Sequence, residues 1–132
     1  MMAASRDHVL DTGPSGLTGH DGTDGSSPSD RCKKYVKLEG SSGENIDYGD
    51  KGPQDVIIAL MIDDGVPSRG HRTNIFNKAF KKMSCFTGDH KTYGKQTVIN
   101  YNGTEQDMQA FMSAKVDFGE PPAGCTGWSV ST

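Results

Sequence analysis

The shortage of large apolar side chains limits what this chain can fold into more than any other feature. Leu, Ile, Val and Phe account for only 22 of the 132 residues, a share below the ~20% at which disorder becomes a concern. Disorder also requires a high net charge, whereas 14 basic and 17 acidic residues leave a formal net charge of −3. The sequence therefore predicts one small ordered domain with a thin core and long loops.

Several classes of protein are excluded by the same composition. The formal net charge is slightly negative, whereas nucleic-acid-binding domains usually carry a clear excess of basic residues. No apolar run approaches the ~18 residues of a transmembrane helix. The first eight residues, MMAASRDH, lack the apolar stretch of a signal peptide. No Gly-x-Ser-x-Gly elbow of a serine hydrolase and no His-Glu-x-x-His zinc helix occurs.

Periodicity and turn signals predict a chain of short elements. Ser27 and Asp30 form a capping box around Pro28, which marks the start of a helix. The expected helices cover residues 2–12, 27–36, 53–62, 71–76 and 105–115. Strands are expected over 82–87 and 96–101, with a hairpin loop over 88–94, loops over 15–26 and 38–54, and a surface tail over 116–132.

Four polar residues stand out because each lies in or beside a glycine-containing loop: His20, Glu44, Asp63 and His71. Two imidazoles and two carboxylates are a competent set for a divalent metal, most naturally zinc. They are also competent as a general acid and base. Their spacing does not show that they converge, and loop residues that bond backbone amides are the simpler interpretation.

Other charged and titratable residues have plainer interpretations. His8 falls on a helix and His90 at a hairpin tip, and we expect both to be solvated or structural. A basic cluster on the second helix is expected to be a solvated face, with an anionic lipid or acidic glycan surface as the alternative; it comprises Arg31, Lys33, Lys34 and Lys37.

Three cysteines and one glycosylation sequon give information on whether the protein is secreted. Cys32, Cys85 and Cys125 allow one disulfide and one thiol, or three thiols. Asn102-Gly103-Thr104 is a glycosylation sequon, which makes Asn102 a candidate acceptor and gives weak support for secretion.

Three segments, taken in order, carry a family resemblance. They are His20 followed by Gly25 and Pro28-Ser29-Asp30-Arg31, then Gly43-Glu44-Asn45-Ile46, then Gly70-His71-Arg72-Thr73-Asn74-Ile75. Over about residues 2 to 101 the chain resembles the CAP superfamily, also called SCP-like extracellular or pathogenesis-related-1 type domains. It is most similar to the bacterial and protist branch.

The resemblance implies an α+β fold, a three-layer α-β-α sandwich around a small antiparallel sheet. It implies a CAP/SCP-like domain over residues 1–101 and a C-terminal extension over 102–132. The family's helix with Asn-x-x-Arg is not found, so we expect the chain to start inside the domain with its first helix missing. Related sequences pair the Cys85 strand with a cysteine on the next strand, which here reads Lys95-Gln96-Thr97-Val98.

Carried over by position, the family's cleft tetrad falls on His20, Glu44, Asp63 and His71. Asp63 stands where the family usually has Glu, which is one methylene longer. Five further residues belong to the matched motifs and are expected to support the cleft: Gly43, Asn45, Gly70, Arg72 and Asn74.

We expect Glu44 to accept a ring N–H from an imidazole, with His71 favoured, so that Glu44→Gln weakens binding and leaves folding nearly intact. Asn45 is expected to hold its loop through the side-chain amide.

The function implied is an extracellular, non-enzymatic binding module without a transmembrane segment. Its ligand would be a lipid or sterol, a divalent metal, a glycan or a protein. One alternative is a metal-assisted hydrolase in which His20 and His71 hold zinc and Glu44 acts as base on bound water. Another is a degenerate fragment whose cleft is vestigial.

Overall fold

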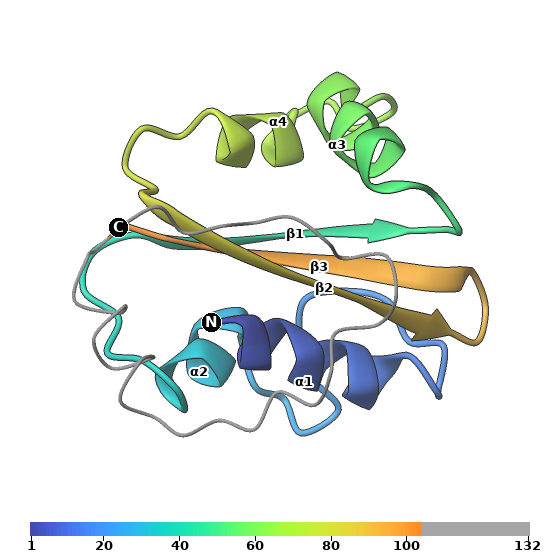
Figure 1. Ribbon diagram of the computed structural model, residues 1–132, viewed down its shortest axis with the longest axis horizontal. Helices are drawn as coiled ribbons and strands as arrows, with labels where there is room; N and C mark the ends of the chain where they lie inside the picture. Colours follow the sequence, from blue (N-terminus) through green and yellow to red (C-terminus); the bar gives the residue numbers. More distant parts are fainter. Residues whose placement is uncertain (104–132) are drawn as a thin grey trace.

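A three-stranded antiparallel sheet lies at the centre of the fold. A computed structural model describes residues 1–103 of the chain, so the helix expected over 105–115, the tail and Cys125 lie outside the described residues. The strands are β1 (Ser42–Tyr48), β2 (Lys82–His90) and β3 (Gly94–Asn102), in the order β1-β3-β2 (Figure 1). The expected α+β fold with an antiparallel sheet is confirmed.

Helices lie against both faces of this sheet. α1 (Met2–Thr12) and α2 (Pro28–Lys33) cover one face, and α3 (Pro53–Ile62) and α4 (Gly70–Ile75) lie over the other (Figure 1). Alternate residues of a strand point to opposite faces, so each strand supplies side chains to both helical layers.

The apolar core is correspondingly divided into small clusters. On the α1 side, Val9 packs with Ile46 and Val98. On the α3 side the buried members of the cluster are Val56, Leu60, Ile99 and Tyr101. The thin core expected from composition is thus confirmed for residues 1–103.

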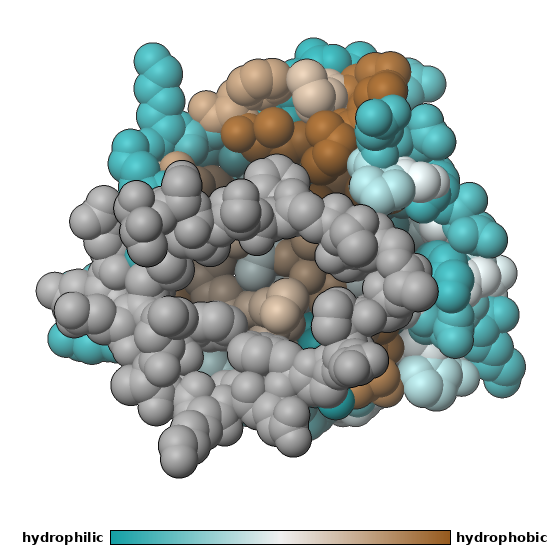
Figure 2. All heavy atoms as spheres, viewed as in Figure 1, coloured by the Kyte–Doolittle hydropathy of each residue, from teal (hydrophilic) through white to brown (hydrophobic). Residues whose placement is uncertain are grey.

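The outer side of α3 remains apolar. Ile58 and Ile62 are 52% and 53% exposed. Figure 2 shows brown, hydrophobic residues gathered at the top of the molecule, where Figure 1 places α3 and α4, and teal, hydrophilic residues along the right-hand edge. Only one side of α3 is therefore used by the core.

Strand β1 was expected to be loop, and this expectation is wrong. Its sequence, SGENIDY, is rich in residues that are depleted in strands, so residue propensities do not predict a strand here. The strand is stabilised by its ladder with β3, which runs from Ser42 opposite Asn102 to Tyr48 opposite Gln96. Long-range pairing has overridden local preference here.

The other elements differ from expectation mainly in length. The capping box at Ser27 is present, but α2 ends at Lys33 and not near Val36. Strands β2 and β3 extend to His90 and Gly94, which leaves a turn of residues 91–93. Gly94, the first residue of β3, has a φ of +80°, a left-handed conformation that is common where a short hairpin connection enters the second strand.

Close packing of α1 on β2 depends on Gly88. A Cβ atom at this position would lie 2.5 Å from Cγ1 of Val9, well inside van der Waals contact. We expect Gly88→Ala to lower the free energy of unfolding by about 1–3 kcal/mol, because an overpacked contact forces side chains or backbone to move. Urea denaturation measures this. Gly70→Ala is the control, since its Cβ would meet only Ser68 Oγ at 3.5 Å; equal losses in the two variants would contradict the packing argument.

Candidate functional site

A buried ion pair between α2 and β1 is the base of the site. Nη2 of Arg31 lies 3.0 Å from Oε2 and 3.3 Å from Oε1 of Glu44. The two side chains are only 4% and 1% exposed. Arg31 also donates to the carbonyl oxygens of Ser26 and His20, each at 2.9 Å. The guanidinium therefore joins the loop before α2 to the edge strand of the sheet.

This role corrects the expectation that Arg31 belongs to a solvated basic face. Lys33, on the same helix, is 60% exposed at its side chain and lies 3.9 Å from Asp30. Arg31 instead faces the sheet and is 3% exposed as a residue. The only signal for this in the sequence was its place at the end of the Pro-x-Asp-Arg motif.

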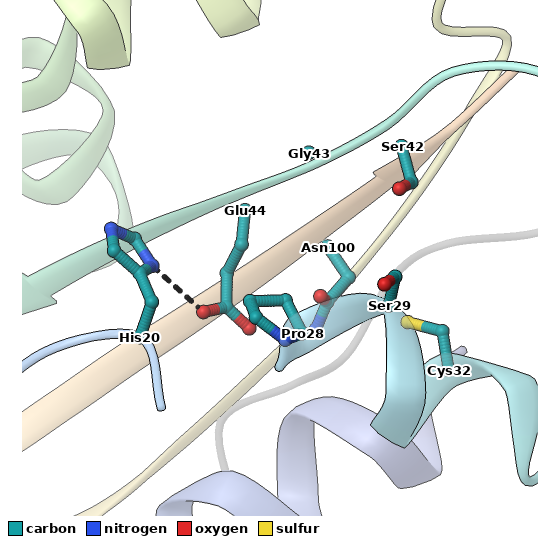
Figure 3. Close-up of a pocket in the computed structure, with 8 residues that line it drawn as sticks. All are labelled: His20, Pro28, Ser29, Cys32, Ser42, Gly43, Glu44 and Asn100. Atoms are coloured by element: carbon teal, nitrogen blue, oxygen red, sulfur yellow. Dashed lines mark hydrogen bonds and ion pairs between the residues drawn. The ribbon is translucent and has the colours of Figure 1, made fainter. Parts of the chain in front are cut away.

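His20 is the exposed member of the same group. Its Nδ1 lies 2.9 Å from Oε1 of Glu44 (Figure 3), and its side chain is 51% exposed. The hydrogen bond to Glu44 raises the pKa of His20 and outweighs burial, which lowers it. Protonated His20 therefore adds stability that is complete below the ordinary value of ~6.5 and is lost as pH rises through the raised pKa.

A pocket of about 300 Å³ opens beside this imidazole. Glu44 and Asn100 contribute from the sheet, and α2 contributes Cys32 (Figure 3). The full lining is His20, Pro28, Ser29, Cys32, Ser42, Gly43, Glu44 and Asn100. One wall is thus formed by the Glu44 strand and the other by the first turns of α2.

His71 forms a second pair, with Asp63. Nδ1 of His71 lies 2.7 Å from Oδ1 of Asp63, and Oδ2 accepts the backbone N–H groups of His71 and Arg72 at 2.9 and 3.3 Å. Burial raises the pKa of Asp63, but these hydrogen bonds, with the His71 ring first, hold that pKa below its ordinary value. Asp63 sits at the end of α3 with a left-handed φ of +54°, which aims its carboxylate at the start of α4.

Glu44 therefore orients His20, and the expectation that it orients His71 is wrong. The reason is the pleat of β1. Glu44 accepts from Arg31 of α2, whereas His71 belongs to α4, which lies over the opposite face of the sheet (Figure 1). The structure divides the tetrad into two His–carboxylate pairs, one on each side of the sheet.

Asn45 connects β1 to the second pair. Its Nδ2 donates to the carbonyl of His71 at 3.0 Å and to the hydroxyl of Tyr101 at 3.2 Å. Its Oδ1 accepts from Nδ2 of Asn74 at 2.8 Å, and Asn74 also donates to the carbonyl of Glu44 at 3.3 Å. The expected tethering role of Asn45 is present in the structure, and Asn74 shares it.

The remaining motif residues shape the backbone around these pairs. A Cβ atom on Gly43 would lie 2.8 Å from Cζ of Phe80, so any other residue at that point of β1 would require the Phe80 ring to move. Gly70 begins α4. Arg72 donates to the carbonyls of Met61 and Ile62, which ties α4 to the end of α3.

The donor set does not fit a zinc ion closed by protein ligands. Within residues 1–103 no group of three or more His, Cys, Asp or Glu side chains lies in a position to hold a metal. Glu44 is engaged by Arg31 and His20, and Asp63 by His71 and the α4 backbone. Structural zinc sites need four protein ligands and catalytic sites three.

Two further expectations concern the surface. Asn102 is fully buried at the end of β3, which argues against its use as a glycosylation acceptor in the folded chain. Cys32 is buried and Cys85 is exposed. Among the described residues, no helix is long and apolar enough to cross a membrane.

The ion pair of Arg31 and Glu44 yields a prediction about stability. Arg31→Met leaves a carboxylate buried without its cation, so we expect the free energy of unfolding to fall by about 3–5 kcal/mol. By the same reasoning Glu44→Gln destabilises the fold, contrary to the expectation from sequence. The double variant Arg31→Met/Glu44→Met should lose less than the sum of the single Met variants in urea denaturation. Lys33→Met is the control. If Arg31→Met lowers the free energy of unfolding no more than Lys33→Met does, the ion-pair role is contradicted.

Asn45 yields a second prediction. The residue is fully buried, so Asn45→Ala leaves the Tyr101 hydroxyl, the Asn74 amide and the His71 carbonyl without this partner. We expect the free energy of unfolding to fall by about 1–3 kcal/mol. The comparison variant is Asn77→Ala, which removes a single exposed bond to the N–H of Ala79. Thermal melts in which Asn77→Ala costs as much would contradict the tether.

Comparison with known proteins identifies the family. The model of the cysteine-rich secretory protein family, CAP, matches residues 1–101. The fold is similar to the crystal structure of an extracellular protein containing an SCP domain from Bacillus anthracis str. Ames, with a TM-score of 0.62 and 20% identity. That match covers 78% of this chain but only 31% of the Bacillus chain. None of the curated proteins matches. The chain belongs to the cysteine-rich secretory protein (CAP) family.

Proposed function

We propose that this chain is an extracellular, non-enzymatic binding module whose ligand is held at the pocket beside His20. Membership of a secretory family and similarity to an extracellular SCP-domain protein support the location. The support for the site is the geometry of a single side chain, the His20 imidazole.

That imidazole is fixed on one side and open on the other. Nδ1 is bonded to a buried carboxylate, while half of the side chain is exposed, and the second ring nitrogen lies on the side away from Glu44 (Figure 3). The other labelled lining residues lie on the Glu44 side of the ring (Figure 3), so Nε2 is available to a ligand group at the outer edge of the pocket. Glu44 orients the ring, as a carboxylate does for a ligating histidine.

The local charge favours an anionic ligand group. Arg31 and Glu44 neutralise one another, so protonated His20 leaves one net positive charge at the pocket. A carboxylate would accept the Nε2–H in a charge-assisted hydrogen bond. The volume of about 300 Å³ lies at the lower end for small-molecule sites. A short acyl chain with a carboxylate head suits both the charge and the volume.

The zinc hydrolase alternative is less well supported by this arrangement. Glu44 would have to act as base while both its oxygens accept hydrogen bonds from Arg31. His20 and His71 would have to share an ion although their partner carboxylates belong to opposite sides of the sheet. Binding through His20 requires neither change.

The test is a calorimetric titration of the full chain with hexanoate between pH 5.5 and 8. We expect affinity to fall as pH rises through the raised pKa of His20, because the imidazolium loses the proton that it donates. His20→Gln should weaken binding by ~10-fold or more, as expected when a charged hydrogen bond is lost. Lys91→Gln removes an exposed cation outside the pocket lining and should leave affinity unchanged.

A parallel titration with zinc chloride distinguishes the alternatives. Metal affinity would rise with pH, since only the neutral imidazole is a ligand. Zinc binding of this kind without hexanoate binding would contradict the carboxylate proposal. An absence of binding by both probes would favour a vestigial cleft.

A further inference from the structure

The segment that carries His20 contains no helix or strand, and side chains from the rest of the domain hold it in place. Besides Arg31, which bonds the carbonyl of His20 itself, three of them act just before His20. It runs from the end of α1 at Thr12 to the start of α2 at Pro28. The three side chains are His8 on α1, Tyr48 on β1 and His90 at the end of β2. All three act on the residues directly before His20.

His90 holds the carbonyl of Leu17. Its Nε2 lies 3.0 Å from that oxygen, and its Nδ1 accepts the backbone N–H groups of Thr92 and Tyr93 at 3.3 and 3.2 Å. An atom that accepts two N–H groups carries no proton, so the ring proton is on Nε2 and is donated to Leu17. The β2–β3 turn therefore sets the tautomer of His90.

Gly19 is held at both of its backbone polar groups. Its N–H is donated to the hydroxyl of Tyr48 at 2.9 Å, and its carbonyl accepts from Nε2 of His8 at 2.9 Å. With a φ of +113°, Gly19 adopts a conformation that other residues rarely reach. The peptide that leads into His20 is therefore fixed in position and in orientation.

The bond from His8 to Gly19 requires a polar imidazole to be buried. The residue is fully buried, and among the described residues Nδ1 has no hydrogen-bond partner. Burial, and then the charge of Arg31, lower the pKa of His8, so the ring is neutral. An apolar side chain would avoid an unpaired buried nitrogen. What the imidazole supplies in exchange is the bond to Gly19.

An aromatic cluster stabilises the other two side chains. The ring of Tyr48 lies 5.1 Å from that of His90 and 5.4 Å from that of Tyr93, and His90 and Tyr93 are also 5.4 Å apart. Tyr48 and Tyr93 thus share one environment. Of these two tyrosines, within residues 1–103, Tyr48 alone has a hydroxyl bonded to the His20 segment.

From these contacts we propose that His8, Tyr48 and His90 are positioning residues for His20, which hold Gly19 and Leu17 so that the His20 ring meets Glu44. Within the part of the chain that the structure describes, the ring itself has one hydrogen bond, to Glu44. A shift of the segment by about 1 Å would break that bond, because interactions weaken steeply beyond ~3.2 Å. The functional meaning of this positioning rests on the role proposed above for His20.

The experiment follows the His20 ring proton by NMR as pH is varied, in the full chain without ligand. In the unsubstituted chain the bond to Glu44 should keep the midpoint above ~6.5. Tyr48→Phe removes one hydroxyl, and the midpoint should shift down toward that value. Tyr93→Phe, in the same aromatic cluster, is the matched control and should leave the midpoint in place. Burial raises the pKa of Tyr48, so no charge is removed by the substitution.

A second pair of variants tests the hydrogen bond from His90. His90→Gln retains an N–H donor of similar reach and should preserve most of the midpoint shift, whereas His90→Leu should lose it. The dispersion of β3 amide signals verifies that each variant is folded, and Tyr48→Phe decides the matter if His90→Leu does not fold. None of the charged groups around His20, namely Glu44, Arg31 and Asp21, is altered.

An unchanged midpoint in folded Tyr48→Phe, or an equal fall in Tyr93→Phe, would overturn the proposal. Hexanoate titration of the same samples separates this inference from the proposed function. If the midpoint falls in Tyr48→Phe but neither the unsubstituted chain nor any variant binds hexanoate, the positioning role is supported and the carboxylate ligand is contradicted.

Discussion

The ion pair between Arg31 and Glu44 is the interaction on which the site depends. Removing two charges from water is costly unless each finds several partners. Here the guanidinium bonds two loop carbonyls as well as the carboxylate, and the carboxylate also bonds the His20 ring. Because these partners come from α2, the preceding loop and β1, the charges are satisfied only when all three are assembled. The contacts that shape the pocket therefore form as the domain folds.

Hydrogen bonds between polar side chains supply part of what the apolar core lacks. Between α1 and the sheet, Asn100 donates to the hydroxyl of Ser5 at 2.7 Å, and Gln96 bonds Thr12 at 3.1 Å and the carbonyl of Val9 at 3.2 Å. All of these residues are buried. Such bonds are directional, so they specify one placement of α1 on the sheet where a few apolar contacts alone would permit several.

The sequence predicted those features that local signals determine. Proline and a capping box marked the start of α2, and the β-branched pair Val98 and Ile99 marked β3. The motifs brought Glu44 and His71 to attention. Three features depend on long-range contacts and were missed: β1 as a strand, the burial of Arg31, and the partner of Glu44. A cation buried by its partner has no local signature, and partner choice follows from a strand register that the sequence alone does not display.

Adjacent residues of one edge strand serve opposite sides of the molecule. Glu44 faces the His20 pocket and Asn45 faces the His71 pair, so a slip of β1 by one residue along β3 would exchange them. A carboxylate would then lie among the Tyr101 hydroxyl and the α4 backbone, and an amide would face the Arg31 guanidinium. One slip would therefore break the contacts of Glu44 and those of Asn45 at the same time. The alignment of this one strand thus determines both whether Glu44 meets the His20 ring and whether Asn45 meets the backbone of His71.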